Sequence, residues 1–180
     1  MKEKNRKFFG ILLRYSILIL TALPNLFLFY LIFTPLTAYP VYWLLSIFHD
    51  ASLLNNDVIL INQAISIELI EACIAGSAYY LLLILNLSTP GIKLNRRIKI
   101  IALSFLIFLV VNVFRIFILS LIAVSGSSFI LGLFDITHWI FWYALSTIFV
   151  VAIWFAEVRI FRIKEIPFYS DIKFLYKNTK

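Results

Sequence analysis

Four stretches of the chain carry apolar residues for long enough to cross a bilayer. They run over about 8–33, 67–87, 100–124 and 136–158. A hydrocarbon core about 30 Å thick needs ~20 residues of helix, and every stretch reaches that length. The pattern therefore predicts an all-α integral membrane protein, a bundle of about four full transmembrane helices that forms a single membrane domain over residues 1–180.

The segment between the first two spans has a different pattern. Residues 41–48 are apolar but too few to span, and they follow Pro35 and Pro40, so we expect a short re-entrant or interfacial helix there. Residues 58–68 are rich in β-branched side chains on both sides of an Asn-Gln pair, which favours a small hairpin or a short extended cap. We expect this cap on the extracytoplasmic side.

The first span has a rival interpretation as a secretory signal peptide, because the basic residues of the 1–7 segment suit the start of one. Its apolar run is longer than the apolar region of a signal peptide, and no clean A-x-A cleavage site follows. We interpret it as a retained helix with a kink at Pro24.

Composition agrees with a membrane protein. Residues of the set AVILMFWYC make up 63% of the chain and charged residues only 14%, and the mean hydropathy is +0.99. A water-soluble fold of this size could not bury so much apolar surface, which excludes a soluble enzyme, a disordered tail and a disulfide-rich secreted domain. Cys73 is the only cysteine, so an internal disulfide and a Cys-x-x-Cys metal or redox motif are excluded as well.

The net charge of +7 would suit a nucleic-acid partner, but the positions of the charges predict a membrane topology. All basic residues except one fall in three clusters, within residues 2–14, 93–99 and 159–180, whereas 34–66 and 125–135 contain no Lys or Arg. Basic flanks stay in the cytoplasm. We therefore expect a multi-pass protein of the plasma membrane, without nucleic acid, whose two termini and basic tail are cytoplasmic.

The remaining basic residue, Arg115, lies inside the third span. A charge there costs at least about 2.5–3.5 kcal/mol on insertion scales, so Arg115 must face a partner or a wet cavity. Asn112 precedes it by three residues and shares its helical face. The alternative to a functional role is a structural pair in which Arg115 holds a carboxylate or backbone carbonyls between helices.

Arg115 is expected in the same leaflet of the membrane as one residue from each of two other spans. At 1.5 Å per residue, Arg115 lies about 14 Å from the outer end of its span and Cys73 about 9 Å below the same surface. His138 stands at the outer start of the fourth span. One sulfur, one guanidinium and one imidazole from three helices thus share the outer leaflet, as a site assembled inside a bundle requires.

Neighbouring residues could support these groups. Gly76 and Ser77 follow Cys73 on the same helical face, where small side chains let another backbone approach; packing alone is the alternative. Asp135 precedes His138 by three residues and could orient the imidazole or merely cap the helix. His138 itself could be one more ring at the membrane interface.

Cysteine, histidine and arginine together suit acyl transfer through a thioester. Cys73 would be the nucleophile, and His138 could take the thiol proton and return it to a leaving amine. Arg115 could stabilise a tetrahedral oxyanion or place the substrate carbonyl. This chemistry needs no metal or cofactor.

Three short blocks in this order, EACIAGSAYYLL (71–82), NVFRI (112–116) and the late His138, resemble the exosortase/archaeosortase family. The resemblance covers about residues 60–155. It implies a membrane-embedded cysteine transpeptidase with Cys73, Arg115 and His138 as catalytic residues near the extracytoplasmic face. Its partners would be exported proteins that end in a short motif, a transmembrane helix and a basic tail, and the acceptor would be a membrane lipid or a surface glycan.

Two other functions remain open from the sequence. A small-molecule-binding membrane subunit of a transporter would match the size and hydropathy, and it predicts indifference to Cys73→Ala. A non-catalytic membrane assembly protein would use Arg115 as a structural charge, and it predicts that Arg115→Lys is tolerated.

Overall fold

The computed structural model describes residues 2–125 and 146–179, and most of these residues are helical. The helices are α1 (Lys2–Ala22), α2 (Phe27–Ser46), α3 (Glu71–Ile74), α4 (Gly76–Leu87), α5 (Leu94–Val124), α7 (Ser146–Ile160) and α8 (Tyr169–Thr179). The strands are β1 (Ala51–Leu54), β2 (Val58–Ile61) and β3 (Ile65–Glu68).

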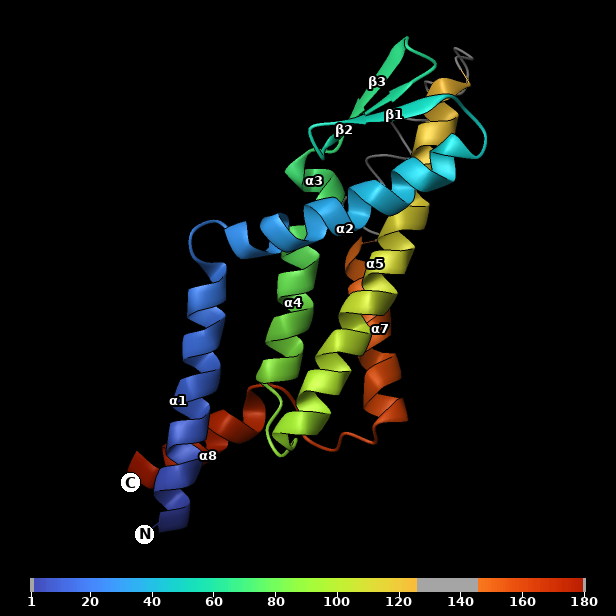
Figure 1. Ribbon diagram of the computed structural model, residues 1–180. Coiled ribbons are helices and arrows are strands. Elements are labelled where there is room, and N and C mark those ends of the chain that lie inside the picture. Colours follow the sequence, from blue (N-terminus) through green and yellow to red (C-terminus); the bar gives the residue numbers. More distant parts are fainter. Residues whose placement is uncertain (1, 126–145, 180) are drawn as a thin grey trace.

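The long helices form a bundle, and α2, α3 and the small sheet cover one end of it (Figure 1). α1, α4, α5 and α7 run along the length of the molecule, and α2 lies across the ends of α1 and α4 and against α5. The small sheet and α3 lie beyond α2, whereas α8 lies at the opposite end beside the start of α1.

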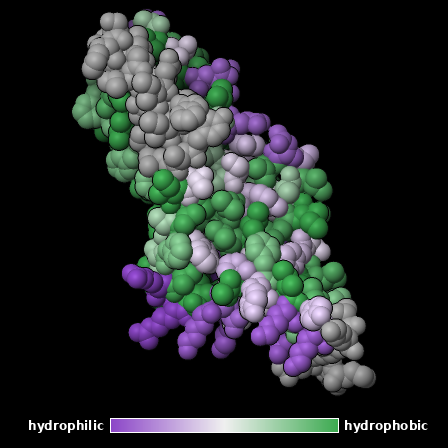
Figure 2. All heavy atoms as spheres, turned by 180° about the vertical axis from the view of Figure 1, so that it is seen from behind, coloured by the Kyte–Doolittle hydropathy of each residue, from purple (hydrophilic) through white to green (hydrophobic). Residues whose placement is uncertain are grey.

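By length and composition, α2 and α5 could each cross a membrane, and the apolar helical segment Glu71–Leu87 is shorter. Many large apolar side chains are exposed, among them Phe9 (64%), Leu20 (69%) and Phe155 (59%). In Figure 2 hydrophobic residues dominate the middle of the molecule, and hydrophilic residues gather toward its two ends. Water-soluble monomers rarely expose apolar patches of this extent.

The prediction of one helical span over 8–33 is wrong. α1 ends at Ala22 and α2 begins at Phe27, because Pro24 has no N–H to continue the helix and the following Asn25 and Leu26 take left-handed backbone angles (φ 48° and 59°). The chain therefore turns between two helices instead of kinking within one.

The prediction of a separate short segment over 41–48 is also wrong. α2 runs through Pro35 and Pro40 to Ser46. Each proline removes one hydrogen bond from the helix, and packing of α2 against α4, α5 and the sheet stabilises it nonetheless.

The other predicted spans need smaller corrections. The second span, 67–87, starts in β3 and is interrupted at Ala75 between α3 and α4. The third lies within α5, which begins six residues earlier than predicted, at Leu94. The described part of the fourth is α7, and the stretch 136–145 lies outside the described residues.

The predicted hairpin over 58–68 is confirmed. β2 pairs with β3 in antiparallel register, Val58 with Glu68 and Ile61 with Ile65, and β1 pairs with the other edge of β2. Asn55, Asn56 and Asn62 supply positive φ at the two turns, which asparagine tolerates better than most residues. Ile59 and Ile61 of the central strand are fully buried.

An aromatic cluster joins α2, α4 and α5 in the core. The Phe33 and Tyr79 rings stack at 3.7 Å between centroids, and Phe108 meets Tyr79 edge-on at 4.9 Å. Phe105 packs against both Phe33 and Tyr79. Aromatic pairs contribute about 0.5–1.5 kcal/mol beyond their buried area, so this cluster fixes the crossing of α2 over the bundle.

The three basic clusters of the sequence meet at the α8 end of the molecule (Figure 1). Arg14 Nη2 donates to Asp171 Oδ1 over 2.8 Å, and Arg96 donates to the Phe161 carbonyl. The N-terminus, the α4–α5 connection and the tail are therefore joined at the end opposite the sheet.

Candidate active site

Cys73 lies on α3, a single helical turn that is separated from α4. Ile70 before the turn is extended (ψ 163°), and Ala75 after it is left-handed (φ 59°, ψ 42°). The left-handed region is unfavourable for a residue with a Cβ, so surrounding contacts must hold this break. Cys73 is a free cysteine and is half-buried.

Asn112 of α5 provides such a contact. Its Nδ2 donates to the carbonyl of Cys73 over 2.9 Å and lies 3.5 Å from that of Ile74, and its side chain is buried. Because the break at Ala75 interrupts the helical hydrogen bonds, these carbonyls need another donor. Asn112 thus positions the backbone of the only cysteine.

Arg115, one turn further along α5, is buried with 7% of its surface exposed. Its Nη1 donates to Ser146 Oγ at the start of α7 over 3.3 Å. Its guanidinium also interacts electrostatically with Cys73. Asn112 and Arg115 form one buried polar face, as their spacing predicts.

A cavity of about 290 Å³ joins Cys73 and Arg115. β3 and the segment that follows it form one wall, and the C-terminal half of α5 forms the other. The complete lining is Ile65, Ser66, Ile67, Glu68, Leu69, Ile70, Cys73, Arg115, Ile116, Leu119, Ser120 and Ala123. A thiol and a guanidinium thus face one largely apolar space, where charge interactions are stronger than in water.

Sequence reasoning missed three polar residues of this lining, Ser66, Glu68 and Ser120. Ser120 is 3% exposed. Its helical spacing from the buried residues of α5 is a signal of burial that the sequence contains. Ser66 and Glu68 belong to β3, and only the packing of the sheet against α2 brings them to the cavity.

The two predicted supporting residues near Cys73 differ in position. Gly76 is buried, and a Cβ at this position would lie 2.8 Å from Cε1 of Tyr30, so the glycine admits the Tyr30 ring. Ser77 is exposed on α4 and does not line the cavity.

His138 and Asp135 lie outside the described residues. Among residues 2–125 and 146–179, Cys73, Arg115 and Asn112 are the predicted site residues that the fold brings together. Within the same part of the chain, no three His, Cys, Asp or Glu side chains are grouped so that they could hold a metal ion.

A second buried polar cluster, which the sequence analysis missed, joins α4, α5 and α7. Glu157 is 1% exposed; its carboxylate accepts from Asn86 Nδ2 over 3.1 Å and from the Ser104 hydroxyl. Because each helix contributes one polar side chain, the cluster fixes their relative rotation.

We expect Glu157→Ala to lower the free energy of unfolding by about 1–3 kcal/mol, because it leaves the Asn86 amide without its carboxylate acceptor in the bundle. Glu157→Gln retains an acceptor oxygen and should lose clearly less. The thermal unfolding midpoint in detergent measures both variants. Equal midpoints for Glu157→Ala and the unmodified protein would contradict a stabilising role.

Comparison with known proteins adds no assignment: no family model, no curated protein and no solved structure matches the chain.

Proposed function

We propose that this chain is an intramembrane cysteine transpeptidase that cleaves C-terminal sorting signals of exported proteins and transfers the new C-terminus to a membrane or cell-surface acceptor. The observation that carries the proposal is the convergence of Cys73 and Arg115, from α3 and α5, on one cavity. A lone cysteine or a lone buried arginine would not suggest this chemistry, but the pair provides a nucleophile and an oxyanion partner.

In this proposal α1, α3–α4, α5 and α7 cross the plasma membrane, and the sheet faces the extracytoplasmic side. The meeting of all three basic clusters at the opposite end supports this orientation, because basic segments are retained in the cytoplasm. The lengthwise course of these helices (Figure 1) supports it as well, and α2 then lies near the outer interface.

The reaction begins when His138 takes the proton of the Cys73 thiol and the thiolate attacks the carbonyl carbon of the scissile peptide. A carbon–sulfur bond forms, and the carbonyl electron pair moves to the oxygen, where the Arg115 guanidinium stabilises the negative charge. Collapse of this intermediate breaks the carbon–nitrogen bond, and the amine leaves with a proton from His138. A hydroxyl or amine of the acceptor then attacks the thioester carbonyl carbon and gives its proton to His138, which is neutral at this point; the carbon–sulfur bond breaks and the thiolate is released.

Water competes with the acceptor for the thioester. The wall formed by β3 and the following segment is mostly apolar, with Ile65, Ile67, Leu69 and Ile70 on the cavity. Such a wall limits the entry of water and favours transfer over hydrolysis.

Trapping of the thioester tests the function. The full chain is co-expressed with tagged exported proteins of the source genome that end in a short motif, an apolar helix and a basic tail. We expect a shortened substrate and a covalent adduct with this protein that neutral hydroxylamine releases. If every such substrate stays at full length and no hydroxylamine-sensitive adduct forms, the proposal is wrong.

A further inference from the structure

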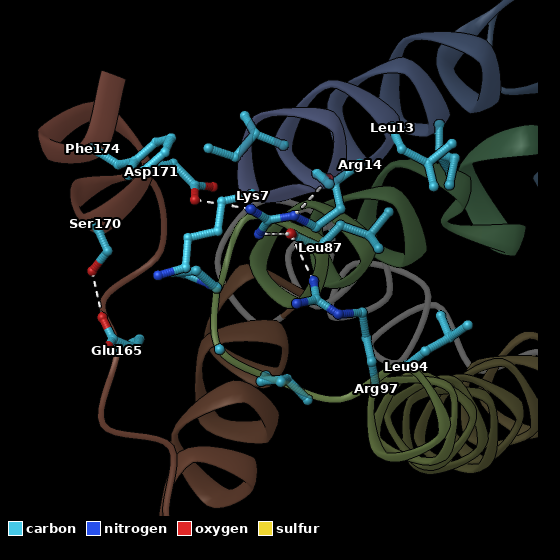
Figure 3. Close-up of a pocket in the computed structure, with 16 residues that line it drawn as sticks. Lys7, Leu13, Arg14, Leu87, Leu94, Arg97, Glu165, Ser170, Asp171 and Phe174 are labelled. Atoms are coloured by element: carbon cyan, nitrogen blue, oxygen red, sulfur yellow. Dashed lines mark hydrogen bonds and ion pairs between the residues drawn. The ribbon is translucent and has the colours of Figure 1, made fainter. Parts of the chain in front are cut away.

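A second and larger pocket lies at the end of the molecule opposite the Cys73 cavity. Its volume is about 540 Å³, and it lies between α1, the α4–α5 connection, the start of α5 and the tail with α8 (Figure 3). The transpeptidase chemistry proposed above does not use it.

Two guanidinium groups meet at the edge of this pocket. Arg14 Nη1 and Arg97 Nη1 both donate to the Leu87 carbonyl, over 3.0 Å and 2.8 Å, as Figure 3 shows. Like charges at such proximity repel each other; Arg14 forms an ion pair with Asp171, whereas the Arg97 guanidinium donates to backbone carbonyls.

The rest of the lining leaves this region cationic. Lys7, about two turns before Arg14 on α1, also faces the pocket (Figure 3). Glu165 lies on the opposite side, where its carboxylate accepts from the Ser170 hydroxyl. An anion beside Lys7, Arg14 and Arg97 would therefore gain from charge complementarity.

The pocket is amphipathic along α1. The Arg14 side chain turns back toward the start of the helix, where its Nε donates to the Gly10 carbonyl over 3.2 Å. Its charge therefore lies nearer to Lys7, and Leu13 and Ile17, which are 51% and 37% exposed, continue the lining toward the other end of α1. Lys7 and Ile17 are separated by about 15 Å along the helix axis. A cationic region followed by an apolar wall suits a molecule with a phosphate group and a hydrocarbon chain, and it does not suit a free phosphate.

The position of α8 agrees with such a ligand. Asp171 on this helix is buried and bonded to Arg14, whereas Ile172 and Tyr176 are 62% and 64% exposed and Lys173 is exposed as well. A short helix with exposed apolar and basic side chains is suited to the headgroup region of a bilayer. The pocket beside it would then open at the depth of the lipid phosphates.

We propose that this pocket binds an anionic phospholipid, with the phosphodiester beside Lys7, Arg14 and Arg97 and one acyl chain along Leu13 and Ile17. The inference rests on the membrane location proposed above but is independent of the chemistry of Cys73. The lipid would join α1 to α8 and so stabilise the cytoplasmic end of the bundle.

Thermal unfolding of the purified full chain in dodecyl maltoside tests this site. Dioleoylphosphatidylglycerol at about 100 times its dissociation constant should raise the midpoint by roughly 5–10 °C. Dioleoylphosphatidylcholine and soluble glycerol 3-phosphate should leave it nearly unchanged. Equal shifts with both lipids, or a full shift with glycerol 3-phosphate alone, would overturn the proposal.

Two variants that each remove one positive charge test whether the lipid binds in this pocket. Lys7→Gln should weaken phosphatidylglycerol binding about fivefold, whereas Arg6→Gln removes one charge at the neighbouring residue, which does not line the pocket, and should leave binding unchanged. Equal affinities for the two variants would show that the pocket is not the binding site. Cys73→Ala should keep the full lipid response even if the transpeptidase proposal fails.

Discussion

Replacement of Cys73 by alanine is expected to abolish substrate cleavage, with a rate at least about 10⁴-fold lower and no hydroxylamine-sensitive adduct. The reason is that the chain contains no other thiol that could form the thioester. The side chain is half-buried and small, so the variant should accumulate in the membrane at the normal level. Immunoblotting of tagged substrate measures the cleavage.

A matched control separates this loss from a general disturbance. Ser16→Ala changes an exposed residue on α1, a helix that contributes no residue to the lining of the cavity, and it should leave cleavage unchanged. Cys73→Ser should also be inactive or very slow, because a serine hydroxyl is a much weaker nucleophile than a thiolate. Normal processing by Cys73→Ala would exclude a catalytic cysteine and would favour a binding subunit.

Arg115→Lys is expected to lower kcat/KM by about 10²–10³-fold although the positive charge is kept. A guanidinium presents several donors in a rigid fork, whereas an ammonium is a compact point charge on a flexible stem, and loss of one oxyanion donor has an effect of this size. Single-turnover measurement of adduct formation would locate the defect in the acylation step.

The same substitution on the same helix provides the control. Arg96→Lys lies at the other end of α5, where Arg96 bonds to the Phe161 carbonyl, and it should not change the acylation rate. If Arg115 served only as a structural charge within an assembly, Arg115→Lys would retain activity. Full activity in that variant would therefore remove Arg115 from the proposed mechanism.

Helical periodicity made part of this arrangement predictable. Arg97, Ser104, Asn112 and Arg115 are buried on α5, at intervals of seven, eight and three residues, which return to one face of a helix. The face of α5 that carries these polar residues is thus the face that packs against the other helices. Helical periodicity therefore predicts that Asn112 lies beside Arg115, and Ser104 and Arg97 follow the same periodicity.

The elements around Cys73 could not be predicted in the same way. Whether Pro24 bends a helix or ends it depends on the next residues, and Asn25 and Leu26 take left-handed angles that no hydropathy pattern encodes. The break at Ala75 depends on a contact with Asn112, which is 37 positions away in the chain. Tertiary packing overrides local propensity at both places.

The wall of the cavity could also be predicted only in part from the sequence. The β2–β3 hairpin followed from its β-branched residues, but the packing of the sheet against α2, across the cavity from the C-terminal half of α5, depends on which face the strands bury. Hydropathy therefore indicated that Cys73 and Arg115 lie at similar depth, but it gave no reason to place Glu68 beside them.

The contact between Arg14 and Asp171 also constrains how the protein is made, because 157 positions separate the two residues. A ribosome that adds about 5–20 residues per second needs roughly 8–30 s to reach the second residue after the first. Throughout that interval α1 lacks the partner of its Arg14 side chain. The ion pair between α1 and α8 can form only after Asp171 has been synthesised.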